Sequence, residues 1–225
     1  MQVPLTYVGR QSNRSDGQAR RVAILEATLK LIVKEGIRGV RHRAVATEAQ
    51  VPLSSTTYYF DDIKDLISDS LTYFAEKNLW MNKVLEQKSY ALIEGLMQAK
   101  QSTNAEQTKL IIIQELSLFI CEHIKGQVAL RHDRILEAAF HEEALRNPQL
   151  AAAIMALDTT FLTSIKQFFI AMGSDTAKTD ANQILAMIKF FEYQYLIREA
   201  IDEEQLVTTI NSTVSYIVNA IKNPS

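Results

Sequence analysis

The sequence has few of the residues that interrupt helices or cross-link chains. Its 225 residues include seven glycines, four prolines and one cysteine. Glycine and proline punctuate strands and turns, so their scarcity favours long helices. The single cysteine, Cys121, allows no intramolecular disulfide, which fits a reducing compartment. It lies in the apolar run LSLFICEHI, and we interpret it as a small buried hydrophobe.

Long apolar runs are also missing. No stretch approaches the ~20 apolar residues needed to span a bilayer. The N-terminal segment MQVPLTYVGRQSNRSDGQARR lacks the apolar core of a signal peptide. We therefore expect a cytoplasmic protein with no membrane partner. Hydrophobic residues nevertheless make up 47% of the chain, which is ample for a buried core.

Charge is unevenly distributed along the chain. Residues 1–60 carry nine Lys and Arg against four Asp and Glu, a net charge of +5. Residues 61–225 carry the remaining 15 against 22, a net charge of −7. The basic end suggests a polyanionic partner, whereas the acidic remainder does not.

Apolar periodicity predicts an all-α fold. The first helix ends at Gly36, which is placed for an αL cap, and the fourth begins at Asp61 with acids in its first turn. Later breaks are the polar QSTNAEQ, Gly126, RNP and GSDTAKTD. The predicted helices are 18–35, 41–49, 53–59, 61–79, 81–100, 105–125, 128–146, 148–171, 178–200 and 203–222.

The third helix is unusual because its side chains are small and polar. Two short helices with a tight turn between them, the second of them polar, match the helix-turn-helix plan, in which the second helix enters the major groove. Short hydroxyls can approach base edges and phosphates closely, and a tyrosine can present its hydroxyl to a phosphate. Val51 and Phe60 are interpreted as core residues. The predicted contacts on this helix are Ser54, Ser55, Thr56, Thr57, Tyr58 and Tyr59.

A family resemblance supports this interpretation. The segment ILEATLKLIVKEGIRGVRHRAVATEAQVPLSSTTYYFDDIKDLI resembles the DNA-binding domain of the tetracycline-repressor (TetR) family across residues 20 to 67. By this resemblance Arg43, Thr57, Tyr59 and Lys64 fall where family members touch DNA, largely its backbone. Lys64 also fits physically, since an ammonium beside a helix N-terminus forms an anion site.

The sequence departs from the family pattern at two positions. Gln50 stands in the turn where family members usually have glycine, and positive φ there would cost about 1 kcal/mol relative to glycine. The second helix begins at Val40-Arg41 without the usual Ser or Thr cap, a loss of roughly 1 kcal/mol. Arg41 is assigned instead to a DNA phosphate.

The resemblance also implies a domain plan and partners. It implies a helix-turn-helix domain over 18–67 and a larger helical effector-binding and dimerisation domain over 68–225, into which the helix 61–79 continues. The polar, irregular sequence of residues 1–17, with Arg10 and Arg14, predicts by itself a flexible basic arm. A small, largely apolar effector would occupy a pocket in the larger domain. The pocket candidates, chosen as large or polar side chains within apolar helices, are Trp80, Phe119, His123, Phe140 and Met155.

Two predicted helices of the larger domain carry more apolar residues than a single core-facing stripe requires. The segments 148–171 and 178–200 are apolar around much of the helix circumference. We therefore expect them to pair with the symmetry-related helices of a second subunit in a four-helix bundle. A homodimer also suits a double-stranded, palindromic DNA operator, because one recognition helix reads few bases. Repression with ligand-induced release is the commoner behaviour in the family.

Other functional classes find little support. HEEAL at 141–145 begins like a helical zinc motif, but Leu145 stands where the second histidine is required. No catalytic triad, phosphate loop or dinucleotide signature is present, so we expect neither enzymatic activity nor a metal or cofactor. A helical ligand carrier or interaction protein with weakened DNA binding remains an alternative, because of the two departures from the family pattern.

Overall fold

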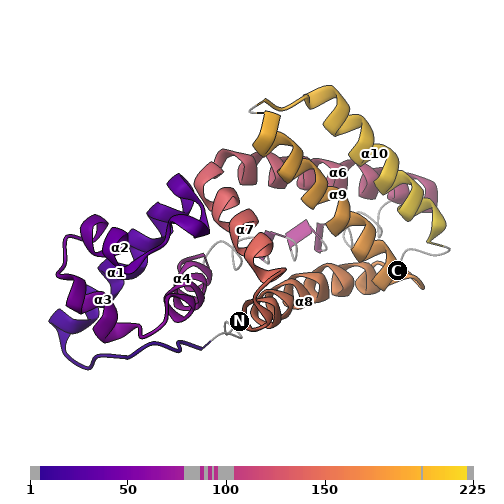
Figure 1. Cartoon of the computed structure of the whole chain (residues 1–225). Coiled ribbons are helices and arrows are strands. Elements are labelled where there is room, and N and C mark those ends of the chain that lie inside the picture. Colours follow the sequence, from indigo (N-terminus) through magenta and orange to yellow (C-terminus); the bar gives the residue numbers. More distant parts are fainter. Residues whose placement is uncertain are drawn as a thin grey trace. The chain divides into compact units, whose positions relative to one another are not determined.

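The computed structural model describes residues 6–78, 87–88, 91–92, 94–95, 104–198 and 200–221. Every regular element in these ranges is a helix (Figure 1), so the predicted all-α fold class is confirmed. The elements are α1 (Ser15–Glu35), the 3-10 helix η1 (Ile37–Gly39), α2 (His42–Glu48), α3 (Leu53–Tyr59), α4 (Ile63–Lys77), α6 (Ala105–Ala129), α7 (Arg131–Ala144), α8 (Pro148–Ala171), α9 (Ala177–Arg198) and α10 (Glu203–Ala220).

The chain divides into two compact units. Unit 1 consists of Met1–Met81 and Ile135–Leu157, and unit 2 of Asn82–Arg134 and Asp158–Ser225. Helices α7 and α8 therefore contribute residues to both units. Unit 1 contains the predicted DNA-binding helices together with a segment of α7 and α8 that the sequence assigned to the larger domain.

Unit 1 is organised around α1, which contacts α2, α3 and α4. Ile24, Leu25 and Ile32 of α1 are almost fully buried in its core. Phe140 of α7 belongs to the same core, and its ring centroid lies 6.2 Å from that of Phe74 on α4. The apolar periodicity of α1 thus holds the short helices in place, since helices of about seven residues are not stable alone.

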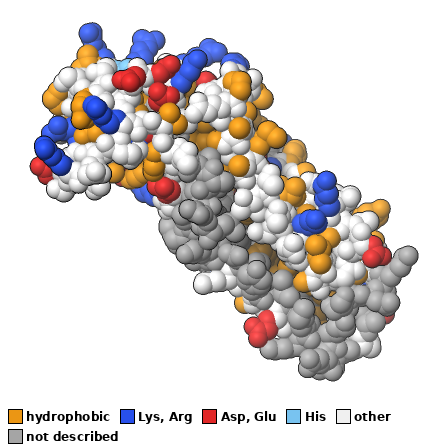
Figure 2. All heavy atoms as spheres, turned by 90° about the horizontal axis from the view of Figure 1, so that it is seen from below, with side chains coloured by type: hydrophobic (Ala, Val, Ile, Leu, Met, Phe, Trp, Pro, Cys, Tyr) orange, Lys and Arg blue, Asp and Glu red, His pale blue; other side chains and the backbone are white. Residues whose placement is uncertain are grey.

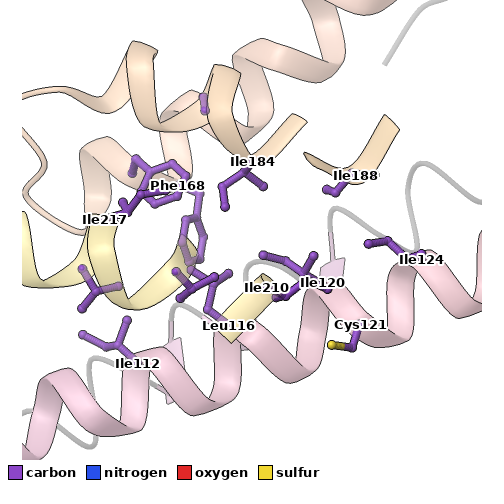
Figure 3. Packing of buried hydrophobic residues seen from close by; sticks show 14 of the residues in the cluster. Ile112, Leu116, Ile120, Cys121, Ile124, Phe168, Ile184, Ile188, Ile210 and Ile217 are labelled. Carbon is purple, nitrogen blue, oxygen red and sulfur yellow. The ribbon is translucent and has the colours of Figure 1, made fainter. Parts of the chain in front are cut away.

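Unit 2 has a separate apolar core built mainly by α6, α9 and α10. Along α6 the buried residues recur every four positions, which places them on one side of the helix. Figure 3 shows this side facing branched aliphatic side chains of α9 and α10, with Phe168 of α8 closing the cluster. The aliphatic residues that Figure 3 labels in this cluster are Ile112, Leu116, Ile120, Ile124, Ile184, Ile188, Ile210 and Ile217.

Helix ends agree with the sequence in some places and not in others. Gly36 has the expected positive φ of 73°, but its ψ of 173° is extended and not αL. The predicted break at Gly126 is wrong, because α6 continues to Ala129. One exposed glycine costs a helix about 1 kcal/mol, which the packed face of a 25-residue helix offsets. The predicted helix 81–100 falls largely outside the described residues.

Residues 8–10, which precede α1, pack against α3 and α4 within unit 1. The backbone N–H of Arg10 donates to the carbonyl of Tyr59 at 2.9 Å. The N–H groups of Val8 and Gly9 both donate to the carboxylate of Asp69 in α4. Residues 8–10, which the sequence analysis placed in a flexible arm, thus have fixed backbone partners. Within the described residues, none of the helices is both long and apolar enough to cross a membrane.

Candidate nucleic-acid interface

The turn between α2 and α3 has the conformation that the sequence suggested. Gln50 has a φ of 55°, and it is the one non-glycine residue with positive φ in the described chain. Its N–H donates to the carbonyl of Thr47 at 3.2 Å, and that of Val51 donates to Ala46 at 3.0 Å. Pro52 then precedes α3 in an extended conformation with ψ 144°. The two short helices therefore form a tight helix-turn-helix.

The start of α2 lacks a side-chain cap, as predicted. Arg41 is the N-cap residue, with φ −140° and ψ 143°, and its side chain makes no capping hydrogen bond. Arg41 and Arg43 are both exposed. They line a shallow hollow of about 440 Å³ between the end of α1 and α2, where Lys34 adds a third cation and Glu35 and Glu48 partly offset the charge.

Helix α3 presents two different faces. Ser54, Thr57 and Tyr58 are exposed, and their i, i+3, i+4 spacing places them on one side of the helix. Tyr58 is 55% exposed. Its ring packs edge-on against that of Tyr59, with the centroids 5.0 Å apart. This side is the part of α3 that a DNA groove can reach.

Three side chains that the sequence assigned to DNA lie on the opposite face, and the prediction is corrected for them. Ser55, Thr56 and Tyr59 are buried, with Thr56 at 0% exposure. The hydroxyl of Thr56 donates to the carbonyl of Leu53 at 2.8 Å, and that of Tyr59 donates to Gly17 at 3.0 Å. The helical period explains this, because positions 55, 56 and 59 lie on the side of α3 opposite 54, 57 and 58 and therefore face the interior of unit 1.

Lys64 is exposed in the first turn of α4. Its backbone N–H, however, already donates to the side chain of Asp62 at 2.9 Å, so Asp62 caps the helix. Asp61 and Asp62 are exposed neighbours in sequence, and they add negative charge near the ammonium group. The predicted anion site therefore rests on the Lys64 side chain and not on the amide of that residue.

Cations gather on the surface of the N-terminal helices. Figure 2 shows several Lys and Arg side chains over the region formed by α1–α4, with a smaller number of Asp and Glu side chains between them. This distribution agrees with the net charge of residues 1–60. A polyanion bound here gains from displaced counterions, which makes its affinity dependent on salt.

A buried ion pair that sequence reasoning missed lies beneath residues 8 and 9, whose N–H groups donate to its carboxylate. Asp69 is 0% exposed and lies 2.5 Å from Nη2 of Arg21. The guanidinium of Arg21 lies 4.4 Å from the ring centroid of Tyr7. Burial raises the pKa of the Asp69 carboxyl, while the N–H groups of Val8 and Gly9 and the charge of Arg21 lower it. Nothing in the spacing of these residues along the chain marks them as partners.

The five pocket candidates do not form one group. Trp80 lies outside the described residues. Phe119 and His123 belong to unit 2, whereas Phe140 and Met155 belong to unit 1. Phe140 is a core residue with 1% exposure, and Met155 is 68% exposed. Phe119 and His123 lie four residues apart on α6, whereas Phe140 and Met155 lie on the different helices α7 and α8.

His123 belongs to a polar cluster inside unit 2 that the sequence did not reveal. Its Nε2 lies 3.7 Å from a carboxylate oxygen of Glu192, which is 6% exposed. Arg134 and Lys189 lie 3.7 and 3.5 Å from the other oxygen of Glu192. The His123 ring is stacked on Phe161, with 6.4 Å between centroids. Only the i, i+3 spacing of Lys189 and Glu192 was visible in the sequence.

The described residues show no candidate metal site. They contain no group of three or more His, Cys, Asp or Glu residues arranged to hold a metal ion. Nδ1 of His141, from the HEEAL segment, lies 2.8 Å from the carbonyl of Glu137 in its own helix.

Comparison with solved structures identifies the fold. A transcriptional regulator from Rhodococcus sp. Rha1 is similar with a TM-score of 0.59 and 18% identity, covering 88% of this chain and 96% of that one. A TetR-family member from Streptomyces coelicolor A3 has a TM-score of 0.52 and 24% identity, with coverage of 86% and 97%. The multidrug binding protein EbrR complexed with ethidium has a TM-score of 0.54 and 23% identity, with coverage of 86% and 98%.

No protein-family model and no curated protein matches the sequence. The similarity therefore lies in the fold, and it extends over most of the chain. The resemblance inferred from residues 20–67 is confirmed at this level: the chain has the fold of TetR-family transcriptional regulators, with a helix-turn-helix near its N-terminus and a larger helical part after it.

Proposed function

We propose that the protein is a TetR-type transcriptional regulator that binds operator DNA as a homodimer and is released by a small, largely apolar effector. The observation that carries the proposal is the exposed polar face of α3, presented by a tight turn from α2. A short helix with small hydroxyl groups on its outer side is suited to the major groove. The cations around it supply attraction to phosphates.

The exposed residues divide by what their side chains can reach. Ser54 and Thr57 are short and can hydrogen-bond base edges in the groove. Arg43, Tyr58 and Lys64 have longer polar side chains suited to phosphate oxygens, and these contacts position the helix without reading sequence. Arg41 is placed with this second group. Ser55, Thr56 and Tyr59 are not among the proposed DNA contacts, because their side chains are buried.

Dimerisation is proposed through α8 and α9. Along α9 four exposed residues, Ala186, Phe190, Tyr193 and Ile197, follow one another at helical spacing. The last three are 58%, 62% and 64% exposed. Large aromatic and aliphatic side chains in one stripe are costly in water and typical of a protein interface. Ile170 of α8, 47% exposed, adds to the apolar surface of these two helices.

The effector site is proposed within unit 2, near Phe119 and His123. EbrR, whose fold is similar, is a multidrug binding protein and forms complexes with ethidium and imidazole. Extending ligand binding to this chain rests on analogy of fold. Release requires that the effector bind the DNA-incompetent conformation more tightly than the competent one. We assign the coupling to α4, which directly follows the recognition helix.

DNA binding is tested with fluorescently labelled duplexes from the region around the gene and an unrelated duplex of equal length. We expect salt-dependent binding with a preference for one gene-proximal duplex. Lys64→Ala should weaken binding to all duplexes, since it removes a phosphate contact, whereas Thr57→Ala should also reduce the preference. Lys178→Ala, an exposed lysine of α9 in unit 2, is the matched control. Equal affinities for wild type, Lys64→Ala and Thr57→Ala would contradict the assigned interface.

The dimer is tested by sedimentation velocity at micromolar concentration. The wild type should sediment as a dimer, and Phe190→Glu should shift it towards monomer by placing a charge in the apolar stripe. Tyr216→Glu on α10 is the control, because Tyr216 is 74% exposed and lies outside the stripe. A monomeric wild type, or a dimer that Phe190→Glu leaves intact, would rule out this interface.

A ligand carrier without DNA binding is the second candidate. It is favoured by the non-glycine residue at φ 55° in the turn and by the uncapped start of α2, both of which weaken the helix-turn-helix. Absence of DNA binding by the wild type at low salt, where electrostatic attraction is strongest, would favour this candidate over a regulator.

A further inference from the structure

The segment before α1 carries an arginine to the exposed side of α3. We propose that Arg10 is an additional DNA-binding residue, a phosphate contact that comes from residues 7–10 and not from helices α2–α4. This inference rests on the proposed function, because the phosphate belongs to the DNA that α3 engages. Three features of unit 1 carry it: the path of the backbone, the fit at Gly9 and the position of the Arg10 guanidinium.

The backbone on both sides of Gly9 is held by hydrogen bonds to two helices. The N–H of Val8 donates to Oδ1 of Asp69 at 2.7 Å, and that of Gly9 donates to Oδ2 at 3.0 Å. The next N–H, that of Arg10, donates to the carbonyl of Tyr59 at the end of α3. Three consecutive amides are therefore bonded, first to α4 and then to α3. Arg10 starts from a fixed position and not from a free tail.

Gly9 lets this backbone lie close to the helices. A Cβ atom at this position would lie 2.5 Å from Cε1 of Phe60 and 2.9 Å from Oδ2 of Asp69. Both neighbours are themselves fixed, because Phe60 and Asp69 are fully buried. Any larger residue must push the segment outward, which gives a way to move Arg10 without altering its charge.

The guanidinium of Arg10 lies over an aromatic ring of the recognition helix. Its Cζ is 4.4 Å from the ring centroid of Tyr58, which places a cation over an aromatic face. Arg10 is exposed, and no carboxylate in the described ranges forms an ion pair with it. This contact restrains the guanidinium, and its N–H donors remain available to an anion. A phosphate group is an anion whose oxygens can accept hydrogen bonds from two of these N–H groups.

The neighbourhood of Arg10 favours DNA as the source of that phosphate. Tyr58 follows Thr57 directly on the exposed side of α3. DNA close enough for the Thr57 hydroxyl to reach a base edge brings a row of backbone phosphates past both sides of α3. Arg10, above Tyr58, meets one of these rows. A contact of this kind adds affinity for every DNA sequence alike.

The test measures the salt dependence of DNA binding by the full chain. In a plot of log affinity against log salt, each lost phosphate contact lowers the slope by about 0.9, or about 1.8 for both subunits of a dimer. Arg10→Gln should show this loss on preferred and random duplexes alike. At 0.1 M salt it corresponds to roughly 60-fold weaker binding, if the affinity extrapolated to 1 M salt is unchanged. Arg10→Lys should keep most of the slope.

Two further variants separate position from charge. Gly9→Ala keeps Arg10 but displaces its backbone, so it should lose a similar part of the slope while far-ultraviolet circular dichroism stays that of the wild type. Arg198→Gln, an exposed arginine at the end of α9 in unit 2, should leave the slope unchanged. An equal loss in Arg198→Gln would show a general charge effect and overturn the assignment.

The inference and the proposed function fail in different ways. If Lys64→Ala lowers the slope and Arg10→Gln does not, the helix-turn-helix binds DNA without Arg10, and the inference is wrong. If the wild type shows no salt-dependent binding to any duplex, the proposed function itself is wrong. A salt-dependent complex with an acidic protein but not with DNA would assign the same cation to a different partner and would also overturn the inference.

Discussion

Gln50 offers a direct test of the backbone conformation in the helix-turn-helix. With φ at 55°, an L-residue with a side chain is held in the left-handed region, and its side chain is exposed. The left-handed conformation costs such a residue about 1–2 kcal/mol. Glycine avoids this cost but loses about 0.5–1 kcal/mol more backbone entropy on folding. Gln50→Gly should therefore raise the free energy of unfolding by roughly 0.5–1 kcal/mol.

The same type of change in a regular helix should have the opposite sign. Lys30 lies in the middle of α1 in the same unit, and its side chain is 71% exposed. Lys30→Gly should lower the free energy of unfolding by about 1 kcal/mol, because glycine is a poor helix former. Gln50→Ala should change the free energy of unfolding little, since alanine also has a Cβ and pays the same steric cost at positive φ as glutamine.

Urea denaturation followed by circular dichroism measures both variants at constant protein concentration. Gln50→Gly should move the midpoint to higher urea and Lys30→Gly to lower urea, with no change in the m-value for either. Destabilisation by Gln50→Gly comparable to that of Lys30→Gly would refute the reasoning. It would mean that the turn does not hold residue 50 at positive φ in solution.

Two further predictions concern polar groups in unit 1. Asp69→Ala should lower the free energy of unfolding by about 3–5 kcal/mol in urea titrations, because Arg21 would remain buried without its partner. The exposed control Asp61→Ala should stay within about 0.5 kcal/mol of the wild type. Equal effects of the two substitutions would contradict a buried ion pair. Burial and then the hydrogen bond to Glu26 raise the pKa of Tyr73 from 10.0 to about 12. Its contribution to stability is therefore present below pH 10 and lost as the pH rises through 12. Across this pH window the melting temperature of Tyr73→Phe should fall less steeply with rising pH than that of the wild type. Identical pH profiles for the two proteins would exclude this role of Tyr73.

The helices of unit 1 were predictable because their signals are local. The apolar periodicity of α1 and the Pro52 that precedes α3 act within a few residues of where they stand. The conformation of Gln50 was predictable for a related reason, since a turn this short between two helices leaves few backbone solutions. The break at Gly126 failed because the cost of one glycine is local, whereas α6 is held in the core of unit 2 by a buried apolar face that runs from Ile112 to Ile124.

The candidate site was predicted only in part. Choosing residues by chemical type on α3 brought in Ser55, Thr56 and Tyr59, whose hydroxyl groups are as polar as those of Thr57. Their burial depends on which side of α3 packs against the other helices of unit 1, and composition does not specify that rotation. The pocket candidates were chosen in the same way, as single large side chains. The division into two units separated them, because the contacts that define a unit join residues distant in sequence.

The sequence by itself determined the helical class, the short polar recognition helix, the basic N-terminal end and the unusual turn residue. These follow from composition, periodicity and backbone preference, which act over a few residues. The tertiary structure alone decided which hydroxyls of α3 stay exposed, that Asp69 pairs with Arg21, and that Arg10 lies over Tyr58. These depend on contacts between residues distant in sequence, such as Val8 and Asp69, which are 61 positions apart. Such contacts form only when the whole core packs, because no single pair is strong enough to form alone.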